Sequence, residues 1–442
     1  MSSDITPPAP GPSSEPCRRK FLRTSGVGAG VLAVGTPLLR AQQQPALRVG
    51  LIGCGGRGSG AATQALAADD NVNLVAMGDA FESAIESSRN GIAEQAGEGP
   101  AGKSKVDVPP ERRHVGTDAF MKVLEEEIDV VILATPPGFR PQHLRAAVEA
   151  GKHIFCEKPM AVDATGVRSV IESAQMARAK NLSLVAGYCW RYSDSRRSAF
   201  QQIEDGAIGT INSIFATYYT GPVKPHPDPS TRPDGMGDVE WQIRNWYNYS
   251  WLSGDGLCEQ AIHSVDKIGW AMGDIDPIAC VATGGRQVPS PGGNIYDHFH
   301  VAYEFPNQVW AHLGCRQIKD CHRENADYIR GDQGALVIGR GGTPILQDND
   351  GKRTWRYQGQ DRNMYQNEHD ELFQGIRKGE ALNDGEWMAH STMLGIMGRM
   401  AAYTGKRVTW EDAMNSEEDL APDSLAFNDN FDPGSWPIPG KG

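Results

Sequence analysis

A glycine-rich motif near the start of the chain constrains its fold more than any other feature. The motif Gly-Cys-Gly-Gly-Arg-Gly occupies residues 53–58, directly after the short apolar run 47–52 and directly before the helix-like stretch 59–68. This order of strand, tight turn and helix is typical of the first unit of a doubly wound parallel sheet. The motif is a weak signal by itself, so the segments that follow decide its interpretation.

Strand-like and helix-like segments alternate up to residue 187. The run 129–134 is apolar throughout, as expected of a strand buried on both faces. Such alternation predicts a parallel sheet covered by helices, and we therefore assign residues 46–187 to an NAD-binding Rossmann domain. The other strand-like runs are 73–77, 153–156 and 182–186, and the helix-like stretches are 141–150 and 165–179.

The second half of the chain has a different pattern. Its strand-like runs alternate with period two and have hairpin-like spacing, which predicts an antiparallel sheet. We assign residues 188–412 to an α/β domain with a large, mostly antiparallel open sheet, and residues 413–442 to an acidic, poorly ordered tail. The expected strands are 211–220, 278–283, 297–305, 309–315 and 335–338, and the expected helices are 257–272, 367–378 and 389–404.

The glycine motif has the residues that a dinucleotide site requires. Gly53 permits the tight turn, Gly55 lets the backbone approach a pyrophosphate, and Gly58 lets the helix pack closely on the sheet. The helix N-terminus, where Gly56 and Arg57 lie, offers free N–H groups and partial positive charge to the phosphates. The alternative is a Rossmann domain that binds another ligand or none.

An acidic residue ends the second strand-like run. Asp79 lies where a carboxylate can accept hydrogen bonds from a ribose diol and repel a 2′-phosphate. Ala80 and Phe81 follow it and provide no arginine for such a phosphate. The sequence therefore favours NAD over NADP as the cofactor.

Two later segments complete the predicted site at the carboxyl ends of strands, where ligands of open α/β sheets bind. Thr135 and Pro136 follow one strand, and Glu157 and Lys158 follow the next. An ammonium at Lys158 can hold a substrate hydroxyl and stabilise a developing alkoxide. The alternative is that Glu157 and Lys158 form a solvated ion pair at a strand end.

The helix expected at 257–272 carries a candidate base. Glu259 and His263 are four residues apart and Asp266 follows three later, so the three side chains share one face of that helix. A histidine with a carboxylate behind it is a suitable general base for a hydroxyl proton. An ordinary surface pair on an amphipathic helix has the same spacing and is the alternative.

Together these motifs resemble the Gfo/Idh/MocA oxidoreductase family. The resemblance implies a Rossmann domain followed by an open antiparallel sheet that often forms homo-oligomer contacts, and activity on sugars, inositols and related polyols. Lys158 matches the family's catalytic lysine and His263 its usual base, whereas Glu259 stands where the common motif has aspartate. The resemblance covers residues 47–410 and rests on GCGGRG, Asp79, TPP at 135–137, GKHIFCEKP at 151–159, GYCWRY at 187–192 and GDGLCEQAIHSVD at 254–266.

Three further residues are candidates for substrate contacts, namely Arg191 in the GYCWRY segment, Trp246 and Asp266. For Arg191, the alternative is a salt bridge at the domain interface. Trp246, like Trp241 and Trp251, could floor a sugar pocket by stacking, but core packing is the favoured interpretation of these tryptophans.

The N-terminus has the features of an export signal. The run Arg-Arg-Lys-Phe-Leu at 18–22 precedes an apolar, glycine-rich stretch at 26–39, which is too short to span a bilayer comfortably. Residues 1–41 resemble a twin-arginine translocation (Tat) signal, which predicts export of a folded protein to the periplasm and no membrane integration after signal removal. The alternative is a basic tail with an accidental apolar run.

Composition argues against several other kinds of partner. The net charge is −12 and no basic cluster persists beyond residue 40, which argues against nucleic acid. The 8 cysteines are spread along the chain without a C-x-x-C pair, unlike a disulfide framework or a zinc ribbon. The histidines and cysteines of 298–322 match no ligand spacing, so no metal is expected.

These observations predict an NAD-dependent oxidoreductase, similar to inositol dehydrogenases, that acts on a secondary alcohol of a sugar or cyclic polyol. In this hypothesis His263, assisted by Glu259, removes the hydroxyl proton while Lys158 stabilises the oxygen. One alternative is a glycoside-cleaving enzyme that uses tightly bound NAD for transient oxidation and elimination. Another is a non-enzymatic, NAD-loaded sugar-binding protein.

Overall fold

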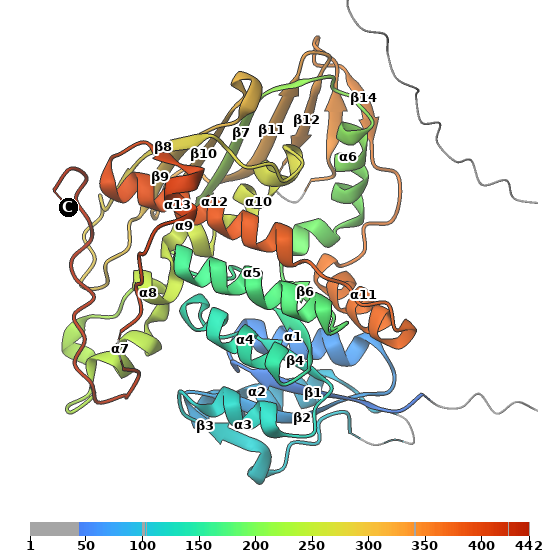
Figure 1. Ribbon diagram of the computed structural model, residues 1–442, viewed down its shortest axis with the longest axis vertical. Helices are drawn as coiled ribbons and strands as arrows, with labels where there is room; N and C mark the ends of the chain where they lie inside the picture. Colours follow the sequence, from blue (N-terminus) through green and yellow to red (C-terminus); the bar gives the residue numbers. More distant parts are fainter. Residues whose placement is uncertain (1–43, 100–101, 103, 340–341, 423, 442) are drawn as a thin grey trace, which may run out of the picture. The chain divides into compact units, whose positions relative to one another are not determined.

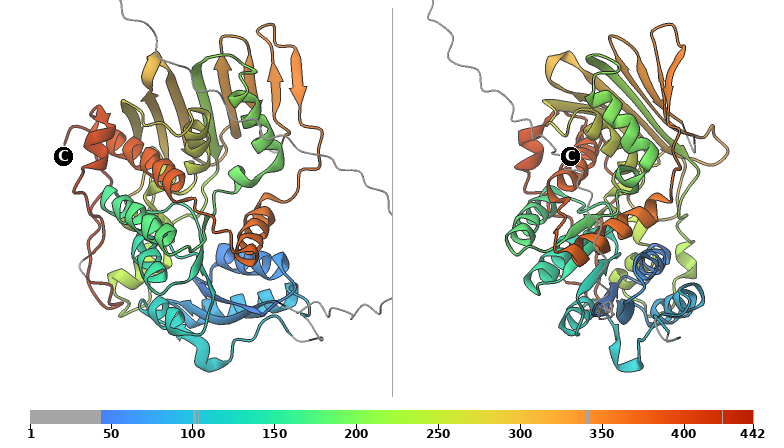
Figure 2. Two further views of the ribbon diagram at one scale, coloured as in Figure 1. Left: turned by 45° about the vertical axis from the view of Figure 1, so that its right-hand side comes forward. Right: turned by 90° about the vertical axis from the view of Figure 1, so that its right-hand side faces the viewer.

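The computed structural model describes residues 44–99, 102, 104–339, 342–422 and 424–441 (Figure 1). The export signal expected at 1–41 lies outside these residues. From Pro45 to the C-terminus the chain forms one compact unit, within which two sheets can be followed. In Figure 2 the strands of the first sheet run from blue to green along the chain, and those of the second from green through orange to red.

The first sheet is parallel and has the strand order β3-β2-β1-β4-β5-β6. This is the doubly wound order of a Rossmann domain, so the predicted fold class is confirmed for this half of the chain. The strands are β1 (Leu47–Ile52), β2 (Val72–Asp79), β3 (Arg113–Val115), β4 (Val130–Leu133), β5 (His153–Cys156) and β6 (Leu184–Ala186). The helices between them are α1 (Gly56–Ala68), α2 (Glu82–Gln95), α3 (Ala119–Glu125), α4 (Arg140–Glu149) and α5 (Ala164–Ala179).

The second sheet has the order β14-β13-β12-β11-β7-β10-β9-β8-β15. Its neighbouring strands are antiparallel except for β7 and β10 in the middle, so the prediction of a large, mostly antiparallel sheet is confirmed. The strands are β7 (Ile211–Thr220), β8 (Ala279–Gly285), β9 (His298–Glu304), β10 (Trp310–Gln317), β11 (Glu324–Gly331), β12 (Ala335–Ile338), β13 (Ile345–Gln347), β14 (Arg353–Arg356) and β15 (Val408–Thr409).

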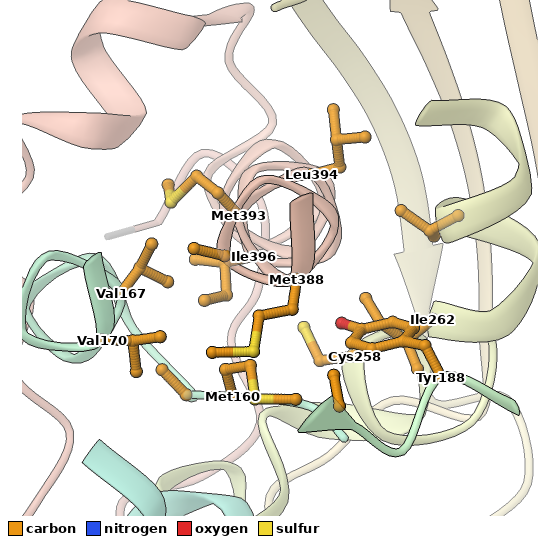
Figure 3. Close-up of a cluster of buried hydrophobic side chains, with 14 of the residues drawn as sticks. Met160, Val167, Val170, Tyr188, Cys258, Ile262, Met388, Met393, Leu394 and Ile396 are labelled. Carbon is orange, nitrogen blue, oxygen red and sulfur yellow. The ribbon is translucent and has the colours of Figure 1, made fainter. Parts of the chain in front are cut away.

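One long helix joins the cores of the two halves. Helix α12 (Gly385–Thr404) packs on β8 and β9 of the second sheet and also on α5 of the first half. Figure 3 shows Met388 and Ile396 of this helix facing Val167 and Val170 of α5. The remaining helices are α6 (Asp194–Glu204), α7 (Asp238–Arg244), α8 (Ser250–Ser253), α9 (Asp255–Glu259), α10 (Ile262–Ala271), α11 (Met364–Lys378) and α13 (Trp410–Met414).

The helix expected at 257–272 is interrupted in the structure. Helix α9 ends at Glu259 and α10 begins at Ile262. The amides of Gln260 and Ala261 both donate to the carbonyl oxygen of Gly256, so the chain widens here beyond the regular i→i−4 pattern. The prediction that Glu259 and His263 share one face of a continuous helix is therefore wrong.

Two C-terminal segments pack on earlier parts of the chain. Helix α11 packs against α1, and its Leu372 and Phe373 belong to the same buried cluster as Leu51 of β1. The tail expected to be poorly ordered instead follows α7, because the apolar residues spaced along its acidic sequence pack on the buried side chains of residues 239–252. That expectation of disorder is wrong for the described residues of 413–441. No helix among the described residues is long and apolar enough to cross a membrane.

Candidate active site

The glycine motif forms the turn that a dinucleotide requires. Gly53 has a φ of +92°, which favours glycine, and a Cβ on Gly58 would lie 1.9 Å from the carbonyl oxygen of Gly53. A Cβ on Gly55 or Gly56 would meet no protein atom within 4 Å, so the backbone there is open to a ligand. Because α1 begins at Gly56, this open surface lies at a helix N-terminus, which suits phosphate oxygens.

A cavity of about 450 Å³ runs from this turn across the carboxyl ends of the first sheet. It brings together residues that are far apart in the sequence, from the end of β1 to the end of α9. All of the predicted cofactor residues line it except Gly58, which lies in the turn itself. Predicted residues in the lining are Gly53, Gly55, Gly56, Arg57, Asp79, Thr135, Pro136, Glu157 and Lys158 for the cofactor, with Glu259 and Trp246.

Asp79 lies at the end of β2, as predicted. Its Oδ2 accepts a hydrogen bond of 2.7 Å from the amide of Cys54, and its Oδ1 accepts one of 3.0 Å from the amide of Phe81. Burial raises the pKa of Asp79 above 3.8, while these amides favour its ionised form. The two bonds fix the carboxylate beside the glycine turn and leave it further lone pairs for a ligand.

Glu157 does not pair with Lys158 but with the glycine turn. The Nε of Arg57 donates to Oε1 of Glu157 over 2.5 Å, and the Glu157 side chain is almost fully buried. Close to this pair lies Glu368 of α11, whose carboxylate oxygens have no hydrogen-bond partner among the described residues. Burial, and then the charge of Glu157, raise the pKa of Glu368 well above 4.5, which favours the neutral form of this carboxyl group. Sequence reasoning missed Glu368, since nothing in its neighbourhood matches a recognised motif.

Lys158 is directed at Glu259. Its Nζ lies 2.5 Å from the carbonyl oxygen of Glu259 and 3.1 Å from Oε1 of the same residue. The two side chains are only 11% and 10% exposed. The alternative of a solvated Glu157–Lys158 pair is therefore wrong, and Glu259 proves to be the partner of the lysine rather than of the histidine. The other oxygen of Glu259 accepts from the side-chain amide of Gln260 over 2.5 Å.

His263 lies near Lys158 but outside the lining of the cavity. Burial, followed by the positive charges of Lys158, Lys267 and Arg57, lowers the pKa of His263 well below 6.5, so the imidazole is neutral. Its Nδ1 is buried and has no hydrogen-bond partner among the described residues. The structure thus brings Lys158, Glu259 and His263 into one region, with Lys158 and Glu259 facing the cavity.

Two sequence profiles of one protein family match this chain. The profile described as oxidoreductase family, NAD-binding Rossmann fold, matches residues 47–188. The profile of the GFO/IDH/MocA C-terminal domain matches residues 197–337. The chain belongs to the Gfo/Idh/MocA family of oxidoreductases. The cavity above is thus built on the NAD-binding Rossmann domain of that family.

Individual relatives agree with this family. The inositol 2-dehydrogenase of Rhizobium meliloti (strain 1021) is 26% identical over 256 residues, which are 58% of this chain and 64% of that protein. Sequence matches to such curated relatives span less than two thirds of the relatives' own length.

Two solved structures share the fold. The aldose-aldose oxidoreductase from Caulobacter crescentus, complexed with glycerol, has a TM-score of 0.63 and 17% identity over 82% of this chain and 99% of that chain. The WlbA dehydrogenase from Bordetella pertussis, in complex with NADH and UDP-GlcNAcA, has a TM-score of 0.61 and 18% identity over 82% of this chain and 98% of that chain.

Two of the predicted substrate residues of this Gfo/Idh/MocA chain pair with each other instead. The Nε of Arg191 lies 2.8 Å from Asp266, and a second nitrogen of the guanidinium lies 2.5 Å from Asp274. The guanidinium also lies 4.3 Å from the ring centre of Trp387, and neither Arg191 nor Asp266 lines the cavity. The structure therefore contradicts the substrate-contact prediction for both residues and supports the interface salt bridge that was the alternative for Arg191.

The three tryptophans of this segment have two different environments: one lies in the cavity wall and two lie in the core. Trp246 lines the cavity, so the favoured interpretation of core packing does not hold for it, and its role as a substrate contact stays a prediction. Trp241 and Trp251 are buried, and the indole N–H of Trp251 donates to the side chain of Gln242 over 2.6 Å. These two tryptophans therefore stabilise the segment that carries Trp246 without contacting the cavity.

Arg140 is a site residue that sequence reasoning missed. Its guanidinium is buried and donates to the carbonyl oxygen of Pro159 over 2.6 Å, and also to that of Thr135. It thereby joins the two loops that follow β4 and β5, on which Thr135 and Lys158 stand. Only the tertiary fold brings these carbonyl groups together, so no local pattern could have revealed the role.

Side chains that bind metals do not cluster in the described part of the chain. No group of three or more His, Cys, Asp or Glu residues there is arranged to hold a metal ion. His300 and His312 do face each other across β9 and β10, with ring centres 5.5 Å apart. The described cysteines are all free thiols.

Proposed function

We propose that this chain catalyses the NAD-dependent oxidation or reduction of a secondary alcohol on a sugar or cyclic polyol. The observation that carries the proposal is the presence of Lys158 in the same cavity as the glycine turn. A dinucleotide bound along that cavity extends from the turn toward the carboxyl ends of β4 and β5, where Lys158 stands. When bound, NAD accepts or donates a hydride, which is the redox part of the reaction.

The residues present fit this cofactor. The open backbone at Gly55 and Gly56 would hold the pyrophosphate, because a side chain at either position would occupy that space. Asp79 would accept the hydroxyls of the adenosine ribose. Arg244 also lines the cavity, but both Nε and Nη2 donate to Glu240 over 2.9 and 2.7 Å. Since its charge is already paired and Asp79 repels phosphate, the site favours NAD over NADP.

Lys158 would hold and polarise the substrate hydroxyl. An ammonium has three N–H donors, and Glu259 accepts from this ammonium at two oxygens. The remaining donor is available to the substrate oxygen and stabilises negative charge that develops there. His263, which is neutral, would accept the hydroxyl proton. In the reverse direction His263 returns the proton and Lys158 orients the carbonyl oxygen.

The substrate class rests on the relatives and on the cavity wall. Inositol 2-dehydrogenase is named for a cyclic polyol, and a levoglucosan dehydrogenase from Pseudarthrobacter phenanthrenivorans is 29% identical over 37% of this chain and 38% of that protein. Trp246 lines the cavity, where its ring would stack on the C–H groups of such a substrate. A sugar or cyclic polyol therefore suits the described cavity.

The proposal is tested by Lys158→Ala, with Lys122→Ala as the matched control. Lys122 is an exposed lysine of α3 that pairs with Asp118 and lies outside the cavity lining. We expect polyol-dependent formation of reduced nicotinamide to fall by about 100-fold or more in Lys158→Ala. NAD binding, measured by calorimetry, should stay unchanged in both variants. Full activity of Lys158→Ala would contradict the role of the lysine.

The second candidate function is glycoside cleavage, in which bound NAD is reduced and then reoxidised within one catalytic cycle. Ile243, Arg244 and Trp246 line the same cavity as the glycine turn, and a wall at this place would slow exchange of the cofactor between turnovers. Such a cofactor suits transient oxidation, elimination and return of the hydride, which cleaves a glycoside without net redox change. Incubation with glycosides in the absence of added NAD distinguishes the candidates, since several product molecules per enzyme would favour cleavage. Tight sugar binding with no turnover in either assay would favour a binding protein.

Export and assembly belong to the same proposal. The Tat-like residues 1–41 would carry the folded, cofactor-loaded chain to the periplasm. Replacement of Arg18 and Arg19 by lysine should retain the protein in the cytoplasmic fraction.

Phe215, Val281 and Trp310 are exposed on the second sheet, which supports a homo-oligomer through this face. Light scattering of the purified protein measures that assembly.

A further inference from the structure

Ile243, Arg244 and Trp246 form part of the wall of the dinucleotide cavity, and a distant C-terminal segment packs on the residues around them. We call residues 238–253, which include α7 and α8, the cap, and residues 424–433 the C-terminal strap. Figure 1 shows the red C-terminal segment running beside α7. Five buried cap residues form a cluster that also takes in Ala80 and Phe81 from the end of β2. Buried members are Val239, Ile243, Tyr249, Trp251 and Leu252, and the strap adds Leu425, Phe427 and Phe431.

Phe81 is the point at which cap, strap and cavity meet. Its ring stacks on the ring of Phe427 with centres 5.5 Å apart and planes 25° apart. The guanidinium of Arg244 lies 3.9 Å from the centre of the same ring. Phe81 and Arg244 both line the cavity, beside Asp79. The contact is therefore at the end of the cavity that would hold the adenosine ribose.

Hydrogen bonds hold the strap on the cap. The amide of Asp238 donates to the carbonyl oxygen of Asp429 over 3.0 Å, and the amide of Phe431 donates to Oδ2 of Asp238 over 3.2 Å. The side chain of Gln242 donates to the carbonyl oxygen of Phe431 over 2.7 Å. A Cβ on Gly237 would lie 2.1 Å from the carbonyl oxygen of Phe427, so the two backbones pack without space for a side chain. Hydrogen bonds and close backbone packing therefore fix the strap on the cap.

We propose that the cap and the C-terminal strap lock the dinucleotide in place, so that NAD is a resident cofactor that leaves only when the Phe81–Phe427 contact opens. The inference rests on the proposed function, because it takes the cavity to be a dinucleotide site. Phe81 and Arg244 contact each other in the cavity wall beside Asp79, and the strap holds Phe81 from outside the cavity, so in this proposal their separation accompanies release of the adenosine half. Phe427 is therefore a positioning residue that slows cofactor release without touching the reacting atoms.

The test compares cofactor release from the full chain and from two variants. Phe427→Ala removes the strap ring, and Trp436→Ala removes an exposed ring of the same C-terminal segment that contacts Arg286 instead of Phe81. Each protein is loaded with NADH, and loss of its fluorescence is followed after addition of excess NAD. We expect release at least tenfold faster from Phe427→Ala and unchanged from Trp436→Ala. Equal release rates in the three proteins would overturn the lock.

A second measurement does not depend on the folding of any variant. Hydrogen exchange of the wild-type chain is compared with and without NADH, in peptides that cover 424–433 and, as a control, 345–356 on the far edge of the second sheet. We expect NADH to slow exchange in the strap peptides alone. Unchanged exchange in the strap, with NADH bound, would overturn the lock and leave the proposed function intact. Failure of the wild-type chain to bind NADH would overturn both.

Discussion

Alanine substitutions at two glycines of the same turn should affect different properties, one the stability of the fold and the other the binding of the cofactor. Gly58→Ala places a Cβ 1.9 Å from the carbonyl oxygen of Gly53, where an ordinary C···O contact is about 3.5 Å, so the turn or the helix must move by roughly 1.5 Å. Such overpacking of backbone on backbone should lower the free energy of unfolding by about 3 kcal/mol. Gly55→Ala adds the same methyl group in open space, with a φ of −72° that alanine readily adopts.

The expected results for the two variants are opposite. In urea denaturation, Gly55→Ala should stay within about 0.5 kcal/mol of the wild type, whereas Gly58→Ala should be clearly destabilised. In calorimetric titration, Gly55→Ala should bind NAD at least tenfold more weakly, a loss of about 1.4 kcal/mol, because its methyl group occupies the space for the pyrophosphate. Wild-type NAD affinity in Gly55→Ala would refute the placement of the pyrophosphate on this turn. Wild-type stability of Gly58→Ala would refute the packing argument.

Three further substitutions test the chemistry and the electrostatics of the site. His263→Ala should lower kcat by about 100-fold with unchanged NAD affinity, and an active variant would remove the histidine as proton acceptor. Asp79→Asn should raise NADP affinity relative to NAD by tenfold or more, about 1.4 kcal/mol, in paired titrations; unchanged preference would contradict its role. Burial raises the pKa of Asp255 from 3.8 to about 6, so the folded chain keeps a proton that the unfolded chain loses between these values. The stability of the wild type should thus fall relative to Asp255→Asn by about 3 kcal/mol as the pH rises from about 4 to above 6, and parallel pH profiles would refute this.

Elements that carry a hydrophobic pattern over their own length could be predicted from the sequence. The expected strands 47–52 and 211–220 coincide with β1 and β7, since alternation or an apolar run marks a strand over its own length. The turn at 53–58 and Asp79 also lie where expected, because the glycine spacing fixes backbone geometry within one unit. The same reasoning located Lys158, whose position depends only on the end of β5.

Features that depend on distant partners escaped sequence reasoning. Spacing placed Glu259 behind His263, but the break after α9 turns its carbonyl and carboxylate toward a lysine 101 residues away. Arg191 pairs with Asp274, 83 residues further along the chain, rather than with a ligand. The acidic composition of residues 413–442 predicts a poorly ordered tail, whereas the few apolar residues of the strap pack on the cap. In each case the deciding contact involves a segment that no local window includes.

The central claim is that one cavity holds both the dinucleotide on the glycine turn and the substrate at Lys158. A crystal structure of the protein with NADH and a polyol tests it most directly. The account predicts the pyrophosphate at Gly55 and Gly56, the adenosine ribose at Asp79, and the nicotinamide ring beside Lys158 with a polyol hydroxyl on its Nζ. A dinucleotide bound elsewhere, or in this cavity with its adenine beside Lys158, would contradict the account.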